Sequence, residues 1–164
     1  MKYYLAILVT VIISGCSFPD GQNYLKVVGD SVEVPSFEIE VTLNKKAEEK
    51  LSNDKETIII MAYFTGNPKD NIPKKYHDKI DIDGLFLRSY SIELKDKRTA
   101  RLQGIKFPKE LFDLLSDKDI DLLINVCSGR RSTDINLLDC DILQDKMSNV
   151  YGKKFTIKGK LIAE

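Results

Sequence analysis

The chain has 164 residues, of which 43% are apolar and 30% charged, and its 25 Lys and Arg balance its 25 Asp and Glu. This length and apolar share suit one globular domain with its own core. The balanced charge disfavours a nucleic-acid binder, which normally carries excess positive charge. The single histidine, His77, is too few for most metal sites and for His-based catalytic triads. We therefore expect no cofactor, no bound metal and no nucleic-acid partner.

The first residues predict export. A short positive start precedes the uncharged apolar run 3–13, which is shorter than the roughly 20 residues that a membrane-spanning helix needs. Ser14 and Gly15 directly precede Cys16, and this segment resembles the bacterial lipobox, whose cysteine becomes the acylated first residue of the mature protein. The resemblance implies a lipoprotein signal peptide over 1–15 and lipidation at Cys16. An ordinary signal peptide with an incidental cysteine is the alternative.

The residues after the cysteine predict the location and the domain. Ser17 resembles the choice made by outer-membrane lipoproteins, so we expect a lipid-anchored protein on the periplasmic face of the outer membrane. The segment 16–23 begins with the lipidated Cys16 and continues as a polar spacer that contains Pro and Gly. The rest of the chain, 24–164, shows no internal repeat and predicts a single domain.

The domain is expected to consist mainly of strands. Residues 37–43 alternate apolar and polar side chains, which is typical of a half-buried strand. The β-branched and aromatic run 57–65 predicts a central strand covered on both faces. Segments 85–94 and 99–107 flank a charged turn and predict a hairpin. Further strands are expected at 120–126, 136–143 and 155–162.

Helix signals are few. Residues 44–51 predict a short helix capped by Asn44, and residues 108–116 predict another that begins at Pro108 and carries leucines on one face. The whole pattern predicts an all-β fold with one or two short helices, mainly an antiparallel β-sandwich of immunoglobulin- or transthyretin-like type. The chain has no Trp, which removes one immunoglobulin hallmark and leaves the exact topology open.

Two cysteines remain in the domain. An even pair in an exported chain, Cys127 and Cys140 predict a disulfide, with two buried free thiols as the alternative. A bridge would clamp the segment between them into a defined loop. Closing such a loop stabilises a fold by roughly 3 kcal/mol in the chain-entropy model.

The segment between the cysteines is the expected partner-binding site. Arg130 and Arg131 stand out because the planar fork of Arg pairs with carboxylates at interfaces. One of them could instead pair internally with Asp134 or Asp139, or both could only fasten the loop. The residues expected to bind a partner are Ser128, Gly129, Arg130, Arg131, Ser132 and Asp134.

No catalytic arrangement is evident in the sequence. The motifs G-x-S-x-G and G-x-x-x-x-G-K do not occur. His77 lies in a charged stretch and predicts an exposed loop residue. Asp81 and Asp83 predict a turn, since the further ligands of a calcium loop are missing. The long segment 66–84 predicts either a functional loop or mobile surface. We expect no enzymatic activity and no catalytic residues.

Two stretches resemble a known family. Residues 124–132 (INVCSGRRS) and 136–140 (NLLDC) are similar to a segment of lipoproteins encoded beside type VI secretion phospholipase effectors. Those lipoproteins are immunity proteins, which bind the toxin in the periplasm and block its active site. The resemblance extends loosely over 57–162 and implies a β-sandwich inhibitor of a phospholipase toxin. An envelope lipoprotein chaperone, or pilotin, for a secretion complex is the alternative, and a binder of a small envelope ligand is a third.

Overall fold

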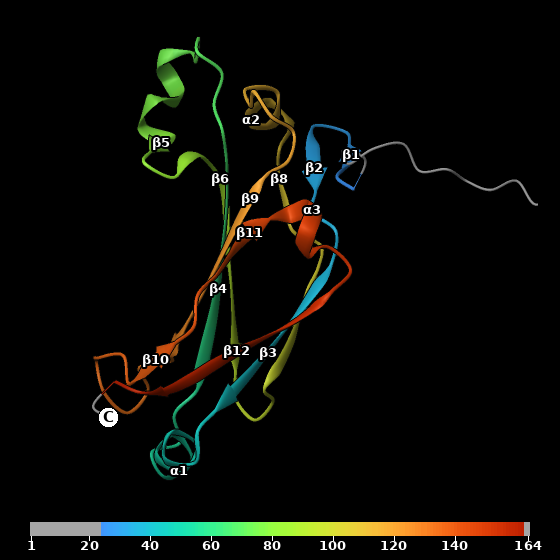
Figure 1. Cartoon of the computed structure of the whole chain (residues 1–164). Helices are drawn as coiled ribbons and strands as arrows, with labels where there is room; N and C mark the ends of the chain where they lie inside the picture. The colour runs from blue at the N-terminus through green and yellow to red at the C-terminus, as the bar shows by residue number, and fades with distance from the viewer. Residues whose placement is uncertain (1–23, 163–164) are drawn as a thin grey trace, which may run out of the picture.

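The computed structural model describes residues 24–162, which form three β-sheets with short helices at their ends (Figure 1). The predicted signal peptide, the lipidation residue Cys16 and the spacer lie outside the described residues. The prediction of an all-β fold is confirmed, because strands are the commonest element of the described chain and the helices are few and short. Along 24–162, no helix is both long and apolar enough to cross a membrane.

The largest sheet has five antiparallel strands in the order β11-β9-β4-β6-β5. Its members are β4 (Ile58–Gly66), β5 (Ile80–Asp81), β6 (Gly84–Leu94), β9 (Asp121–Ser128) and β11 (Leu143–Lys146). The predicted central strand is confirmed as β4, but the prediction that both of its faces are covered is wrong. Ile60 and Phe64 are fully buried, whereas Met61 and Tyr63 between them are only half-buried on the outer face.

The second sheet has four strands in the order β10-β12-β3-β7. Its members are β3 (Phe37–Leu43), β7 (Thr99–Leu102), β10 (Leu138–Cys140) and β12 (Lys154–Leu161). The strands predicted at 37–43 and 155–162 are confirmed as β3 and β12. These two strands pair in parallel, with Ile157 opposite Val41, which the sequence analysis did not predict.

The predicted hairpin of 85–94 and 99–107 is wrong. Strand β6 pairs with β4, whereas β7 pairs with β3 in the other sheet, so the charged segment 95–98 passes from one sheet to the other. The crossing is held because Val41 donates its backbone N–H to the Arg98 carbonyl at 2.7 Å. The Arg98 guanidinium also donates two bonds to Glu48, at 3.1 and 2.7 Å. The predicted strand 136–143 is likewise divided between two sheets, as β10 and β11.

The remaining elements close the ends of the two large sheets. A three-stranded antiparallel sheet contains β1 (Lys26–Val28), β2 (Ser31–Glu33) and β8 (Lys106–Pro108). The helices are α1 (Lys45–Asn53), α2 (Lys109–Asp113), α3 (Met147–Val150) and the 3-10 helix η1 (Lys74–Lys79). The two predicted helices are confirmed as α1 and a shorter α2, and the Asn44 side chain caps α1 by accepting the Ala47 N–H at 2.9 Å.

One apolar core joins the sheets. Ile39 and Ile157 from the four-stranded sheet belong to the same buried cluster as Phe64 and Ile124 from the five-stranded sheet. Full burial of such a side chain stabilises the fold by about 1.5–3 kcal/mol, so this shared core holds the sheets together. The immunoglobulin- or transthyretin-like arrangement of the strands stays a prediction.

Candidate functional site

The loop that follows β9, residues 129–137, lies at the same end of the molecule as α1 (Figure 1). It leaves the sheet at Gly129, whose N–H donates to the Thr57 carbonyl at 2.8 Å. A Cβ at Gly129 would lie 1.8 Å from Thr57 Oγ1, so no larger residue fits without movement. The chain here therefore requires glycine because the two backbones approach closely, and Gly129 shapes the loop rather than offering a side chain to a partner.

Ser128 closes the base of the loop. It is fully buried, and its backbone N–H donates to Asn136 Oδ1 at 2.9 Å. Its hydroxyl accepts the Leu137 N–H at 2.9 Å, while the Asn136 amide donates to the Leu138 carbonyl at 2.7 Å. The prediction that Ser128 contacts a partner is wrong, because its polar atoms are used inside the chain and no surface remains exposed.

Glu56 anchors the middle of the loop. Its carboxylate, in a residue only 5% exposed, accepts the backbone N–H groups of Arg131 and Ser132 at 2.9 Å each. It also accepts the Ser132 hydroxyl at 2.7 Å and the Thr57 N–H at 2.9 Å. Burial acts to raise the pKa of Glu56, but the hydrogen bonds from Ser132, Arg131 and Thr57 outweigh it and lower that pKa to about 2. The buried charge therefore fixes the loop in one conformation.

Arg131 lies on the outer side of this anchor. Its guanidinium donates to both oxygens of Glu93, at 2.9 and 2.8 Å, and Thr57 Oγ1 donates to the same carboxylate at 2.7 Å. The bonds from Arg131 and Thr57 lower the pKa of Glu93 to about 2. The prediction that an arginine pairs with Asp134 or Asp139 is wrong, since Glu93 takes Arg131 and Asp139 lies 3.8 Å from Lys160.

The tip of the loop carries the accessible side chains. Arg130 and Asp134 are exposed, and neither forms a hydrogen bond or ion pair with any residue of 24–162. Ile135 beside them is 67% exposed. Arg130 has a φ of +58°, a conformation unusual for a residue with a Cβ, and this backbone position directs the chain between the Gly129 and Glu56 attachments. Of the predicted partner residues, Arg130 and Asp134 remain available to a partner.

The predicted disulfide is absent from the structure, in which Cys127 and Cys140 are free thiols. Cys127 pairs with half-buried Ile59 of β4 and so lies on the outer face of the five-stranded sheet. Cys140 pairs with Gly159 of β12 and packs against the core from the other sheet. The two thiols thus belong to different sheets and different faces, and the loop is clamped by Glu56 instead of a bridge.

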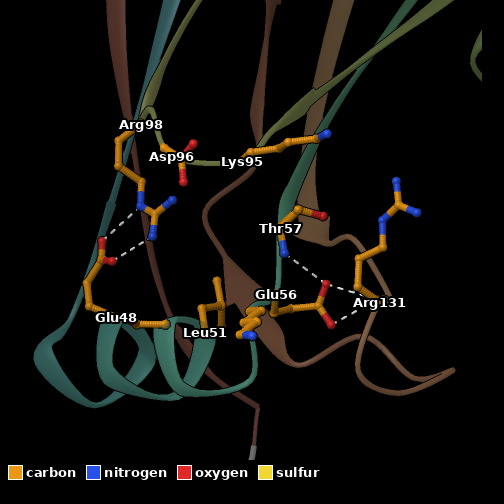
Figure 2. Close-up of a pocket in the computed structure, with 10 residues that line it drawn as sticks. Glu48, Leu51, Glu56, Thr57, Lys95, Asp96, Arg98 and Arg131 are labelled. Carbon is orange, nitrogen blue, oxygen red and sulfur yellow. Dashed lines mark hydrogen bonds and ion pairs between the residues drawn. The ribbon is translucent and has the colours of Figure 1, made fainter.

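A pocket of about 670 Å³ opens between α1 and the loop (Figure 2). The paired side chains of Glu48 and Arg98 form one side, and Glu56, Thr57 and Arg131 form the other. One guanidinium nitrogen of Arg98, Nη1, is buried without a hydrogen-bond partner among the described residues. The walls carry charges of both signs, which suits polar or charged protein side chains. Within residues 24–162, no three His, Cys, Asp or Glu side chains gather as metal ligands would.

The other residues singled out in the sequence lie elsewhere. His77 is exposed in η1, with its Nε2 3.0 Å from the Ile72 carbonyl. Asp81 and Asp83 form the predicted turn, in which Asp81 Oδ1 accepts the Asp83 N–H at 2.9 Å. The segment 66–84 contains η1 and β5 and is thus partly regular.

The sequence analysis missed Glu56 and Glu93. Glu56 lies in the short segment between α1 and β4, where a charged residue suggests exposed surface, and Glu93 occupies an ordinary alternating position of β6. The sequence spacing does not show that either glutamate contacts the loop, because 75 positions separate Glu56 from Arg131 and 38 separate Arg131 from Glu93.

No family model, no curated protein and no solved structure matches the chain.

Proposed function

We propose that this chain is a periplasmic lipoprotein that binds a protein partner through the loop 129–137 and has no catalysis of its own. The partner is a phospholipase toxin of a type VI secretion system, and the chain is its immunity protein. The observation that carries the proposal is Arg130, an exposed cation without an ion-pair partner within 24–162, at the tip of a loop held by the buried Glu56 carboxylate.

The anchored loop suits tight binding. A flexible loop loses conformational entropy when a partner orders it, and this cost subtracts from the affinity. The hydrogen bonds of Glu56 and the pairing of Arg131 with Glu93 order the loop before any partner arrives. Arg130 can then pair with a carboxylate at the toxin's cleft, while the loop excludes substrate by occupying the cleft entrance. A lipid on Cys16 would hold the protein beside the bilayer on which the toxin acts and raise its local concentration there.

Binding to the phospholipase encoded by a neighbouring gene tests the proposal. We use the chain that begins at residue 16 with Cys16→Ser, since residues 24–162 contain the core described above. Titration calorimetry should give a dissociation constant below about 1 μM, which corresponds to a binding free energy of about 8 kcal/mol. An equimolar amount of the protein should suppress lipid hydrolysis by the phospholipase. Absence of a complex, or binding to a secretin subunit instead, would contradict the toxin partner and favour the pilotin alternative.

Arg130→Gly identifies the docking residue. Because Arg130 has a positive φ, glycine fits its backbone better, so this variant should keep the loop and raise the free energy of unfolding by about 0.5–1 kcal/mol. Loss of the guanidinium should nevertheless weaken toxin binding by about tenfold or more. Lys158→Gln serves as the control, because it removes an exposed positive charge on the outer face of the four-stranded sheet. This variant should leave the affinity for the toxin unchanged.

A further inference from the structure

Apolar side chains follow strand β4 along the middle of the outer face of the five-stranded sheet. On β4, Ile59, Met61 and Tyr63 alternate with the core residues and are half-buried. The outer face of the four-stranded sheet instead carries charged residues such as Glu38, Glu40 and Lys158. The stripe on β4 is flanked by exposed Ser89 and Ser91 of β6 and Asn125 of β9, so its apolar part is confined to the centre of the face.

This face is hollowed at the end where β4 finishes. A pocket of about 460 Å³ is lined by Tyr63, Phe86, Leu122 and Leu123. Ile82, in the turn between β5 and β6, stands at its rim and is the most exposed large apolar residue of the described chain, at 101%. A bound segment can thus insert an apolar side chain into the hollow and cover Ile82 at the same time.

The rim of the hollow is negative. Asp81, Asp83 and Asp121 line it, and the residues that line it include no Lys or Arg. Asp121 accepts from Lys146 at 3.0 Å, and Asp81 accepts the Asp83 N–H. The Asp83 carboxylate has no hydrogen-bond or ion-pair partner among residues 24–162. The carboxylates of Asp81 and Asp83 beside the rings of Tyr63 and Phe86 suit an Arg or Lys side chain. The stem of such a side chain packs on the rings while its charged group lies near the carboxylates.

We propose that this hollow is a second docking site, which binds a segment of a protein that carries a basic residue between apolar residues. It is independent of the loop 129–137. Along β4, Ile58 is opposite Ser128 and Thr65 is opposite Asp121, so the sites are roughly 25 Å apart at about 3.4 Å per residue. An anionic membrane surface would be repelled by the aspartates, which favours a cationic protein segment.

Titration of the chain that begins at residue 16, with Cys16→Ser, tests this site by NMR. The probes are three capped peptides of equal length: Leu-Arg-Leu, Leu-Gln-Leu and Leu-Glu-Leu. Leu-Arg-Leu should shift the amide signals of Tyr63, Phe86 and Leu123, and Leu-Gln-Leu should bind several-fold more weakly. Equal binding of Leu-Glu-Leu, or no shift with any peptide, would overturn the proposal.

Variants separate the site from unspecific attraction. The double variant Asp81→Asn plus Asp83→Asn should weaken Leu-Arg-Leu binding by about two- to fivefold, the effect expected for exposed ion pairs. Asp134→Asn, an exposed acid at the other end of the sheet, and Arg130→Gly should leave this titration unchanged. If the protein sediments as a dimer and Leu123→Glu makes it a monomer, the face serves self-association and the proposal is overturned. Sedimentation of the protein with phosphatidylcholine vesicles would assign the face to lipid and overturn the proposal as well.

Discussion

The two ends of β4 differ in how the surrounding charges are used. Where β4 begins, Glu56 and Glu93 receive hydrogen bonds from the loop 129–137, and the pKa of each is lowered to about 2. Where β4 finishes, Asp83 faces a partly apolar hollow with no partner among the described residues. The first end uses its carboxylates to hold the chain, whereas at the second end the Asp83 carboxylate is not used by residues 24–162.

Structural charges and recognition charges differ in the bonds that they receive from the chain. A carboxylate that collects several backbone N–H groups is committed to the fold, because removal leaves those donors unsatisfied. A carboxylate at an apolar rim without a counter-charge adds little to the fold and is available for binding.

Neutralising Glu56 should have the largest effect. A pKa of about 2 against the ordinary 4.5 corresponds to about 3 kcal/mol at neutral pH, so Glu56→Gln should lower the free energy of unfolding by about 2–3 kcal/mol. Asp83→Asn is the matched change at the other end and should alter it by less than about 0.5 kcal/mol. Urea denaturation measures both. Equal losses in the two variants would erase the distinction between the ends.

The pH dependence should identify the same anchor. Because the folded-state pKa of Glu56 lies below 4.5, its contribution to stability is present above that pH. This contribution is lost progressively as the pH falls from about 4.5 to about 2, when the carboxylate takes up a proton in the folded state. The gap between the wild type and Glu56→Gln should therefore narrow over this range. Urea midpoints at pH 5, 4, 3 and 2 measure it, and a constant gap would contradict the anchor.

Gly129→Ala should destabilise the anchored end by about 2 kcal/mol, a typical cost of overpacking. The new Cβ would meet Thr57 Oγ1, which is 1.8 Å from its ideal position. In a Thr57→Ala background this contact is removed, so the same substitution should cost less than about 1 kcal/mol. A double-mutant cycle of unfolding free energies makes the comparison. No coupling between the two positions would mean that the clash is not the cause.

The smallest effect concerns the thiols, which lie at the anchored end without contributing to its clamp. Burial raises the pKa of Cys127, and burial with the neighbouring Asp139 and Asp141 raises that of Cys140 to about 11. Iodoacetamide at pH 8 should therefore alkylate both slowly in the folded chain, since the thiolate is the reactive form. Mass spectrometry should find both alkylated after unfolding without reductant. If neither cysteine is alkylated after unfolding, the two thiols are joined in a disulfide, which contradicts this expectation.

Local patterns predicted strands more reliably than their partners. The alternation of 37–43 and the β-branched run 57–65 were sufficient for β3 and β4, because side-chain period is a local property. The pairing of β7 with β3, and the parallel pairing of β12 with β3, depend on contacts between distant segments. A charged turn between two strands looks the same whether it closes a hairpin or crosses between sheets.

The partner-binding role of the loop stays a prediction, but the structure shows how its residues are arranged. The sequence analysis allowed one of the two arginines to pair internally without saying which, and the structure pairs Arg131 with Glu93, leaves Arg130 exposed and buries Ser128. The cysteine pair predicted that a disulfide holds the loop, whereas the Glu56 carboxylate holds it in the structure. A single glutamate signals nothing about burial in a sequence, since only the folded chain brings backbone N–H groups to it.

Strand β12 sits between β10 and β3, so the four-stranded sheet lacks one of its two central strands until the last strand of the described residues is made. Its partner β3 must wait for it while more than a hundred residues are synthesised, with an unpaired edge exposed. Such distant pairing slows folding, because the entropy of closing the intervening chain is lost before the contacts form. We therefore expect the four-stranded sheet of the nascent polypeptide to stay incomplete until β12 has been synthesised.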